Sequence, residues 1–136
     1  MIVADTNLVA YFLIRGAFTT EAERIRARDR LWLVPPLFRS EFLNVLGSHI
    51  RFLGMDRDKA LKLFHRGMSM VKVSDADPDP VGVLNICQSG NCSSYDAEFV
   101  WLARDRRIPL VTADDGIIQA FPDVAVHITR FDVPTP

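Results

Sequence analysis

The chain begins with Met1-Ile2-Val3-Ala4-Asp5-Thr6-Asn7, and this stretch decides the fold. Residues 2–4 are apolar and partly β-branched, which predicts a short buried strand. An apolar helical run resumes at 8–13, so Asp5 is expected where a strand ends and a helix begins. Open α/β sheets bind their ligands at the carboxyl ends of their strands. The same position also suits a helix cap, because Asp and Thr side chains accept hydrogen bonds from free N–H groups.

The rest of the chain alternates short apolar runs with helical patterns. Further strands are predicted at 31–34, 68–73, 110–112 and 124–128. Helices are predicted at 20–30, 37–53, 56–66, 81–88, 94–107 and 117–121. The pattern shows no repeat or linker, and 136 residues is the usual size of one domain. We therefore expect a single α/β domain over 1–136, with a mainly parallel sheet of about four or five strands flanked by helices.

The helix predicted at 37–53 is the longest, and Gly54 is expected to end it. Its apolar stripe contains Phe38, Phe42, Val45, Leu46, His49, Ile50 and Leu53. The next helix is expected to begin at an N-cap, Asp56, and to stop before Gly67.

Composition favours an intracellular protein, and the charge distribution is compatible with a polyanionic partner. No apolar run is long enough to cross a membrane and no basic region precedes the first one, so we expect a soluble, cytoplasmic protein without a membrane partner. Two cysteines, Cys87 and Cys92, are too few for a disulfide scaffold. Residues 15–72 carry twelve Lys and Arg against six Asp and Glu, whereas 73–136 carry four against ten. Solvated helix faces explain such an asymmetry, and so does a polyanion-binding protein with an acidic metal site.

Two carboxylates lie on the apolar sides of predicted helices. Glu41 shares a helix face with Phe38 and Val45, and a buried carboxylate is costly unless it is paired or binds a cation. The alternative is a Glu at the edge of the stripe, paired with a neighbouring base. Asp96 lies on the core-facing side of its helix, although the stretch 93–96 also resembles a capping box.

Two further carboxylates follow predicted strands. Asp5 follows 2–4 and Asp114 follows 110–112, and acids at the ends of parallel strands can lie side by side at the carboxyl edge of the sheet. Asp114-Asp115-Gly116 is also a turn sequence on its own, and Asp115 competes for any functional role. Four converging carboxylates would raise one another's pKa values unless cations bind among them. All-oxygen ligands favour Mg²⁺ or Mn²⁺ over zinc.

The motifs around these acids resemble those of the PIN-domain ribonucleases. They are Asp5-Thr6-Asn7, Glu41, Tyr95-Asp96-Ala97 with Leu102-Ala103, and Thr112-Ala113-Asp114. Their order and the length of the chain are similar to the VapC-type toxins of toxin–antitoxin pairs. The resemblance implies a Mg²⁺- or Mn²⁺-dependent endoribonuclease whose catalytic acids are Asp5, Glu41, Asp96 and Asp114. Of these, Asp5, Asp96 and Asp114 would bind the metal. Asn7 and Thr112 match supporting polar positions, and the family pattern Thr-x-Asp selects Asp114 over Asp115.

The resemblance also implies partners: an RNA substrate, a cognate antitoxin protein bound by helices of the first half, and a second copy of the chain in a homodimer. Candidates for RNA phosphate contacts are Arg24, Arg26, Arg28, Lys59, Lys62, Arg104 and Arg107. Three alternatives compete. A phosphatase of the haloacid dehalogenase type would need a second Asp where Asn7 stands. A non-catalytic RNA-binding module would be expected to lack some of the four acids. A nuclease of the same fold could instead act on DNA or in RNA processing.

Overall fold

The computed structural model describes residues 1–131, and five short strands form one all-parallel sheet in it. The strands are β1 (Ile2–Ala4), β2 (Trp32–Val34), β3 (Val71–Val73), β4 (Leu110–Thr112) and β5 (Ala125–His127). Their order across the sheet is β3-β2-β1-β4-β5. The predicted α/β fold is confirmed, and β1 and β4 are neighbouring inner strands whose carboxyl ends lie together. The last five residues of the predicted domain, 132–136, lie outside the described part.

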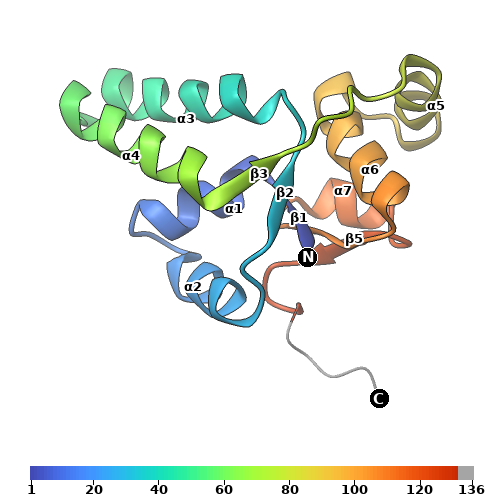
Figure 1. Cartoon of the computed structure of the whole chain (residues 1–136), viewed down its shortest axis with the longest axis horizontal. Helices are drawn as coiled ribbons and strands as arrows, with labels where there is room; N and C mark the ends of the chain where they lie inside the picture. Colours follow the sequence, from blue (N-terminus) through green and yellow to red (C-terminus); the bar gives the residue numbers. More distant parts are fainter. Residues whose placement is uncertain (132–136) are drawn as a thin grey trace.

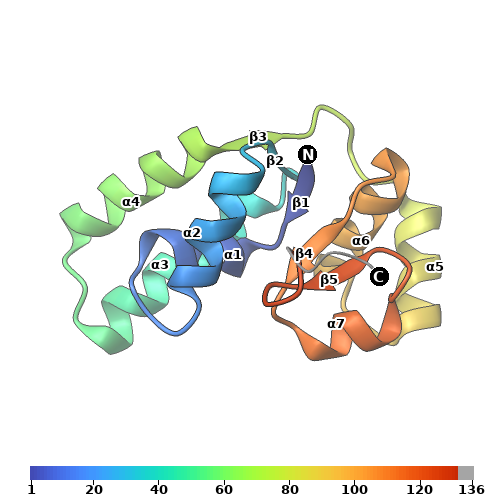
Figure 2. The same cartoon turned by 90° about the horizontal axis from the view of Figure 1, so that it is seen from below.

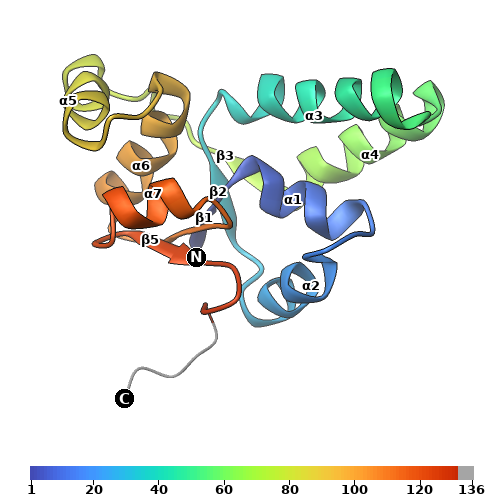
Figure 3. The ribbon, with the colours of Figure 1, turned by 180° about the vertical axis from the view of Figure 1, so that it is seen from behind.

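Helices cover both faces of this sheet. In the described chain they are α1 (Thr6–Leu13), α2 (Thr19–Arg28), α3 (Phe38–Leu53), α4 (Arg57–Met70), α5 (Pro80–Gly90), α6 (Ser94–Arg106) and α7 (Asp115–Ala120). Helices α1 to α4 gather on one side of the sheet and α5 to α7 on the other (Figures 1 and 3). Within residues 1–131, no helix is both long enough and apolar enough to cross a membrane.

The inner strands are short runs of apolar residues because they lie in the core. Every residue of β1, β2 and β4 is buried, as strands covered by helices on both faces require. Helix α3 adds two stacked rings, Phe38 and Phe42, whose centroids lie 5.4 Å apart. The inner strands β1, β2 and β4 hold no charged residue, and the first ionisable side chain after β1 is Asp5, at the carboxyl rim of the sheet.

The predicted strand at 68–73 is wrong over its first half. Helix α4 continues through Gly67 to Met70, and β3 begins only at Val71. Gly67 does not end the helix. It lies instead where the ring of Phe42, on α3, packs closely against α4. A Cβ atom at this position would overlap two ring atoms of Phe42 and lie in tight contact with a third. The glycine therefore marks a close contact between α3 and α4 rather than a helix end.

The predicted apolar stripe of α3 is also wrong at its far end. Phe38, Phe42 and Leu46 are buried, but Ile50 and Leu53 are exposed. Only the first half of α3 reaches the core, since α3 and α4 extend side by side beyond the sheet (Figure 2). The helix ends at Gly54 as predicted, with the glycine in the left-handed conformation at φ 69°.

Candidate active site

A pocket opens at the carboxyl end of β1 and β4, between the first turns of α3 and α6. Its volume is about 420 Å³, within the range of small-ligand sites. All four predicted acids line it: Asp5, Glu41, Asp96 and Asp114. The other lining residues are Thr6, Asn7, Leu37, Ser40, Asn44, Val45 and Tyr95. The fold thus brings together four acids that are far apart in the sequence, with the predicted supporting residue Asn7 beside them.

The first acid is held by a threonine from the neighbouring strand. Asp5 occupies the N-cap position of α1, but its side chain makes no capping hydrogen bond to that helix as described. Its Oδ2 instead accepts a 2.7 Å hydrogen bond from the hydroxyl of Thr112. The same hydroxyl accepts the backbone N–H of Asp114 at 3.0 Å. The buried Thr112 side chain therefore links the two acids that follow β1 and β4.

Glu41 is held by a residue that the sequence analysis considered only as a possible helix cap. Its Oε1 accepts a 2.8 Å hydrogen bond from the hydroxyl of Thr6, the first residue of α1. Only 4% of Thr6 is exposed, so this hydroxyl is screened from competing water. Thr6 and Asn7 are both polar, and Asn7 is exposed, so no sequence pattern showed that the Thr6 side chain faces inward. The two consecutive residues Asp5 and Thr6 thus supply one pocket carboxylate and orient another.

The remaining two acids both lie at helix starts. Ser93 caps α6, because its hydroxyl accepts the backbone N–H of Asp96 at 3.1 Å. Asp114 caps α7 through a 3.1 Å hydrogen bond from Ile117 N–H, and it lines the pocket as well. The side chain of Asp115 is 84% exposed and lies against His127, at a different pocket on the surface. Asp114, and not Asp115, is therefore the member of this pair that lines the acidic pocket.

The pocket concentrates negative charge. Burial raises the pKa of Asp5 to about 6, and the charges of Glu41 and Asp96 add to the rise, while the Thr112 hydrogen bond opposes it. Burial and the charge of Asp96 raise the pKa of Glu41 against the opposing hydrogen bond from Thr6. Burial and the charge of Asp114 raise the pKa of Asp96. No Lys or Arg of the described residues lines this pocket, so its charge calls for a cation from outside the chain.

A fifth acid stands behind this group and was missed by the sequence analysis. Burial raises the pKa of Glu98, and the charges of Glu41 and Asp77 raise it further. Glu98 follows Asp96 by two residues on α6 and does not line the pocket in the described structure. No sequence pattern distinguishes it from an ordinary exposed helix residue. It adds to the negative potential behind Glu41.

The carboxylate oxygens suit a hard cation such as Mg²⁺ or Mn²⁺. Within residues 1–131, however, no three His, Cys, Asp or Glu side chains are grouped closely enough to hold a metal ion by themselves. Mg²⁺ usually keeps several waters and takes only one or two carboxylates together with phosphate oxygens of the substrate. The pocket therefore fits a hydrated cation shared with a phosphate-containing substrate, rather than a closed cage of protein ligands.

Two of the cations predicted to contact RNA already have structural partners. The guanidinium of Arg26 donates to the backbone carbonyls of Arg30 at 2.9 Å and Met70 at 3.0 Å. Arg104 makes two 3.0 Å hydrogen bonds to the carboxylate of Asp123. These contacts tie α2 to the end of α4, and α6 to the loop before β5.

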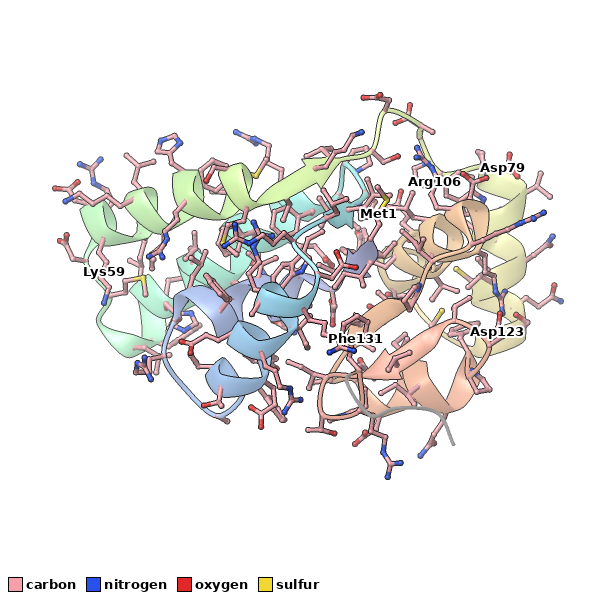
Figure 4. The ribbon with its side chains drawn as sticks, turned by 60° about the horizontal axis from the view of Figure 1, so that its bottom comes forward. Met1, Lys59, Asp79, Arg106, Asp123 and Phe131 are labelled. Carbon is pink, nitrogen blue, oxygen red and sulfur yellow. The ribbon has the colours of Figure 1, made fainter. Side chains whose placement is uncertain are left out.

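The predicted phosphate-binding cations do not gather at the pocket. None of the seven lines it in the part of the chain that the structure describes. Lys59, near the start of α4, and Arg106, next to the candidate Arg107, lie toward opposite ends of the molecule (Figure 4). Their predicted contacts with RNA therefore stay a prediction, and a substrate would have to cover much of the surface to reach them all.

A family model described as "PIN domain" matches residues 2–124. The chain belongs to the PIN domain family. All four acids of the pocket lie within the matched range. Among solved structures, the crystal structure of PAE2754 from Pyrobaculum aerophilum aligns with a TM-score of 0.71 and 19% identity, over 94% of this chain and 83% of that one.

A second solved structure, a toxin–antitoxin complex from Klebsiella pneumoniae, aligns with this PIN domain at a TM-score of 0.66 and 14% identity. The alignment covers 94% of this chain and 98% of that one. At such identities the two structural similarities show a shared fold alone. No curated protein sequence matches the chain.

Proposed function

We propose that this chain is a Mg²⁺- or Mn²⁺-dependent endoribonuclease and the toxin of a type II toxin–antitoxin pair. The observation that carries the proposal is the convergence of Asp5, Glu41, Asp96 and Asp114 on one pocket that no Lys or Arg of the described residues lines. Membership of the PIN domain family supports nuclease activity. The similarity to a chain in a toxin–antitoxin complex, over nearly the full length of both chains, supports the toxin role and an antitoxin partner.

Within this proposal, Asp5, Asp96 and Asp114 would hold a hydrated metal ion, one or two of them by direct contact and the rest through its bound waters. Bound divalent cations would lower the pKa of a water molecule and stabilise the leaving oxygen of the phosphodiester. Glu41 either joins the ligands or orients the attacking water from α3. Thr112 keeps Asp5 ionised and oriented, because its hydroxyl donates to the carboxylate. Thr6 does the same for Glu41.

The nucleophile in this proposal is water and the bond broken is the one between phosphorus and the 3′-oxygen, so the products carry a 5′-phosphate and a 3′-hydroxyl. Attack by the ribose 2′-hydroxyl would instead need a base and an acid, for which metal-free ribonucleases commonly use histidines. Within the described residues, no histidine lines the acidic pocket. The side chains present therefore favour hydrolysis assisted by a cation.

The test is cleavage of a total RNA preparation with Mg²⁺, with chelator, and by the variants Asp5→Asn and Asp96→Asn. Asn keeps the size of the side chain but removes the charge that binds metal, so activity should fall by orders of magnitude. Asp115→Asn is the matched control, since its carboxylate lies outside the pocket, and it should cleave as the wild type does. Full activity in chelator, or 2′,3′-cyclic phosphate ends, would overturn the proposal.

The toxin role has its own test. Expression of the wild-type chain in the cytoplasm of a host cell should arrest the growth of that cell, whereas expression of the Asp5→Asn variant should not. A short open reading frame immediately upstream, encoding a DNA-binding antitoxin, should relieve the arrest when it is expressed together with the toxin. Light scattering should give the mass of the proposed homodimer. Cleavage of RNA without growth arrest would favour the alternative, a PIN-domain nuclease of RNA processing.

A further inference from the structure

One residue of the pocket has no role in the chemistry of the four acids. Tyr95 lies in the first turn of α6, directly before Asp96, and lines the same pocket. Tyr95 is 59% exposed, although burial of its large aromatic ring would be energetically favourable. Two residues further along α6, Ala97 is fully buried, so the helix is anchored while the tyrosine stays at the surface.

The wall formed by α3 carries neutral polar groups. Ser40 and Asn44 are four residues apart on α3, so they share one side of the helix, and both line the pocket. A hydroxyl and an amide can each donate and accept hydrogen bonds. The four acids supply the negative charge that attracts a cation, and Ser40 and Asn44, being neutral, add nothing to it. The pocket therefore contains a second set of groups, suited to a flat ligand with polar edges.

We infer that Tyr95, Ser40 and Asn44 form a subsite for an unpaired RNA base beside the bond to be cut. The inference rests on the proposed ribonuclease function and adds to it the residues that would recognise a base of the substrate. The ring of Tyr95 stacks on the base, and the side chains of Ser40 and Asn44 bond to its edge. Unstacked bases in single strands and loops offer both a face and an edge for such recognition.

Duplex RNA cannot use this subsite. In an A-form helix each base face is covered by its neighbours, and the deep major groove hides the base edges from side chains. Stacking on an aromatic side chain tolerates every base, so Tyr95 should favour unpaired RNA in general, while Ser40 and Asn44 would set a preference among bases. The predicted signature is a contribution of Tyr95 to single-strand binding that is absent with a duplex.

The test measures binding apart from cleavage, in protein that carries Asp5→Asn throughout. The probes are a short single-stranded RNA containing 2-aminopurine and a duplex of the same sequence. Tyr95→Ala should weaken single-strand binding about tenfold or more, whereas Tyr95→Phe should keep it, because the ring alone stacks. Quenching of 2-aminopurine fluorescence should survive in Tyr95→Phe and vanish in Tyr95→Ala. Duplex affinity should be the same in all three proteins.

The control is Phe52→Ala, which removes a 68% exposed ring near the far end of α3 and should leave RNA binding unchanged. If Tyr95→Ala binds single-stranded RNA as tightly as its parent, the inference is overturned. The exposed ring of Tyr95 would then be a contact for a protein partner. An equal loss on single strand and duplex would also overturn it. Failure of the proposed function can be told apart from failure of this inference. In that case the wild-type protein would leave RNA intact with Mg²⁺, whatever affinities the variants carrying Asp5→Asn show.

Discussion

The hydroxyl of Thr112 donates a 2.7 Å hydrogen bond to Oδ2 of Asp5, across the paired strands β4 and β1. Because the same hydroxyl already accepts the N–H of Asp114 at 3.0 Å, its single proton is directed at Asp5. A donor aimed at a carboxylate favours the ionised form. The pairing of β4 with β1 therefore places the donor that favours the ionised form of Asp5, the most buried acid of the pocket.

Replacing Thr112 tests this relationship. Thr112→Val keeps the shape of the side chain and removes the donor, so Asp5 should lose affinity for its cation. A hydrogen bond to a charged group contributes about 1.5–3 kcal/mol, which corresponds to roughly a ten- to hundredfold loss of RNA cleavage. Thr112→Ser should restore most of the activity, because it retains the hydroxyl. A valine variant as active as the wild type would contradict this role.

Thr6 offers a second test, at the carboxylate of Glu41. Thr6→Val removes the donor to Glu41 and should lower cleavage about tenfold, with Thr6→Ser close to the wild type. The decisive control is the double variant with Glu41→Gln. If Thr6 acts through Glu41, then Thr6→Val should cost little once Glu41 is gone, because the two changes are coupled. Additive losses would instead show that Thr6 serves only the packing of α1.

The raised pKa of Asp5 predicts how stability changes with pH. The carboxyl has a pKa of about 6 when folded, above the ordinary value near 3.9 that it has when unfolded. Between these values the folded state binds more protons, so stability of the metal-free protein should fall as pH rises from about 4 to 6. Asp5→Asn should remove this penalty and gain roughly 1–3 kcal/mol near neutral pH, allowing for solvent screening. Below about pH 4 the gain should disappear.

Urea unfolding of both proteins at acidic and neutral pH measures the effect. Asp115→Asn, which changes an exposed carboxylate, should show no such gain. Adding Mn²⁺ at neutral pH should stabilise the wild type more than Asp5→Asn, because the cation neutralises the repulsion that the variant has lost. A gain for Asp5→Asn that is equal at both pH values would contradict the assigned cause.

The sequence predicted the fold and the gathering of the acids because both follow from short-range patterns. Short, β-branched apolar runs such as Ile2–Ala4 are typical of inner strands, and an acid that directly follows such a strand lies at the rim of the sheet. Glu41 and Asp96 were recognised because each interrupts an apolar helix face. These signals need no knowledge of what packs against them.

The rest depends on contacts between elements that no local pattern records. Thr6 differs from an ordinary helix cap only because α3 brings Glu41 to within 2.8 Å of its hydroxyl. Ser40 and Asn44 matter only because Tyr95 lies across the same pocket. Gly67 resembles a helix stop in sequence, yet it is a contact point for Phe42. In each case the deciding neighbour is more than twenty residues away in the sequence.

Two glycines allow the close packing of α3 against α4 to be tested. Gly67 and Gly47 both lie inside helices, and alanine is the better helix former by about 0.5–1 kcal/mol. A Cβ at Gly67 would overlap the buried ring of Phe42, whereas a Cβ at Gly47 would meet nothing within 4 Å. Gly67→Ala should therefore destabilise the protein by about 1–3 kcal/mol through overpacking, despite its better propensity.

Gly47→Ala is the matched control and should stabilise the protein by about 0.5–1 kcal/mol. Chemical denaturation of both variants beside the wild type measures the two effects, which should have opposite signs. Adding Phe42→Leu to Gly67→Ala should recover part of the loss, because a smaller side chain leaves room for the new methyl group. Equal and positive effects at both positions would mean that 67 is an ordinary helix site, and that the ring of Phe42 moves aside at little cost.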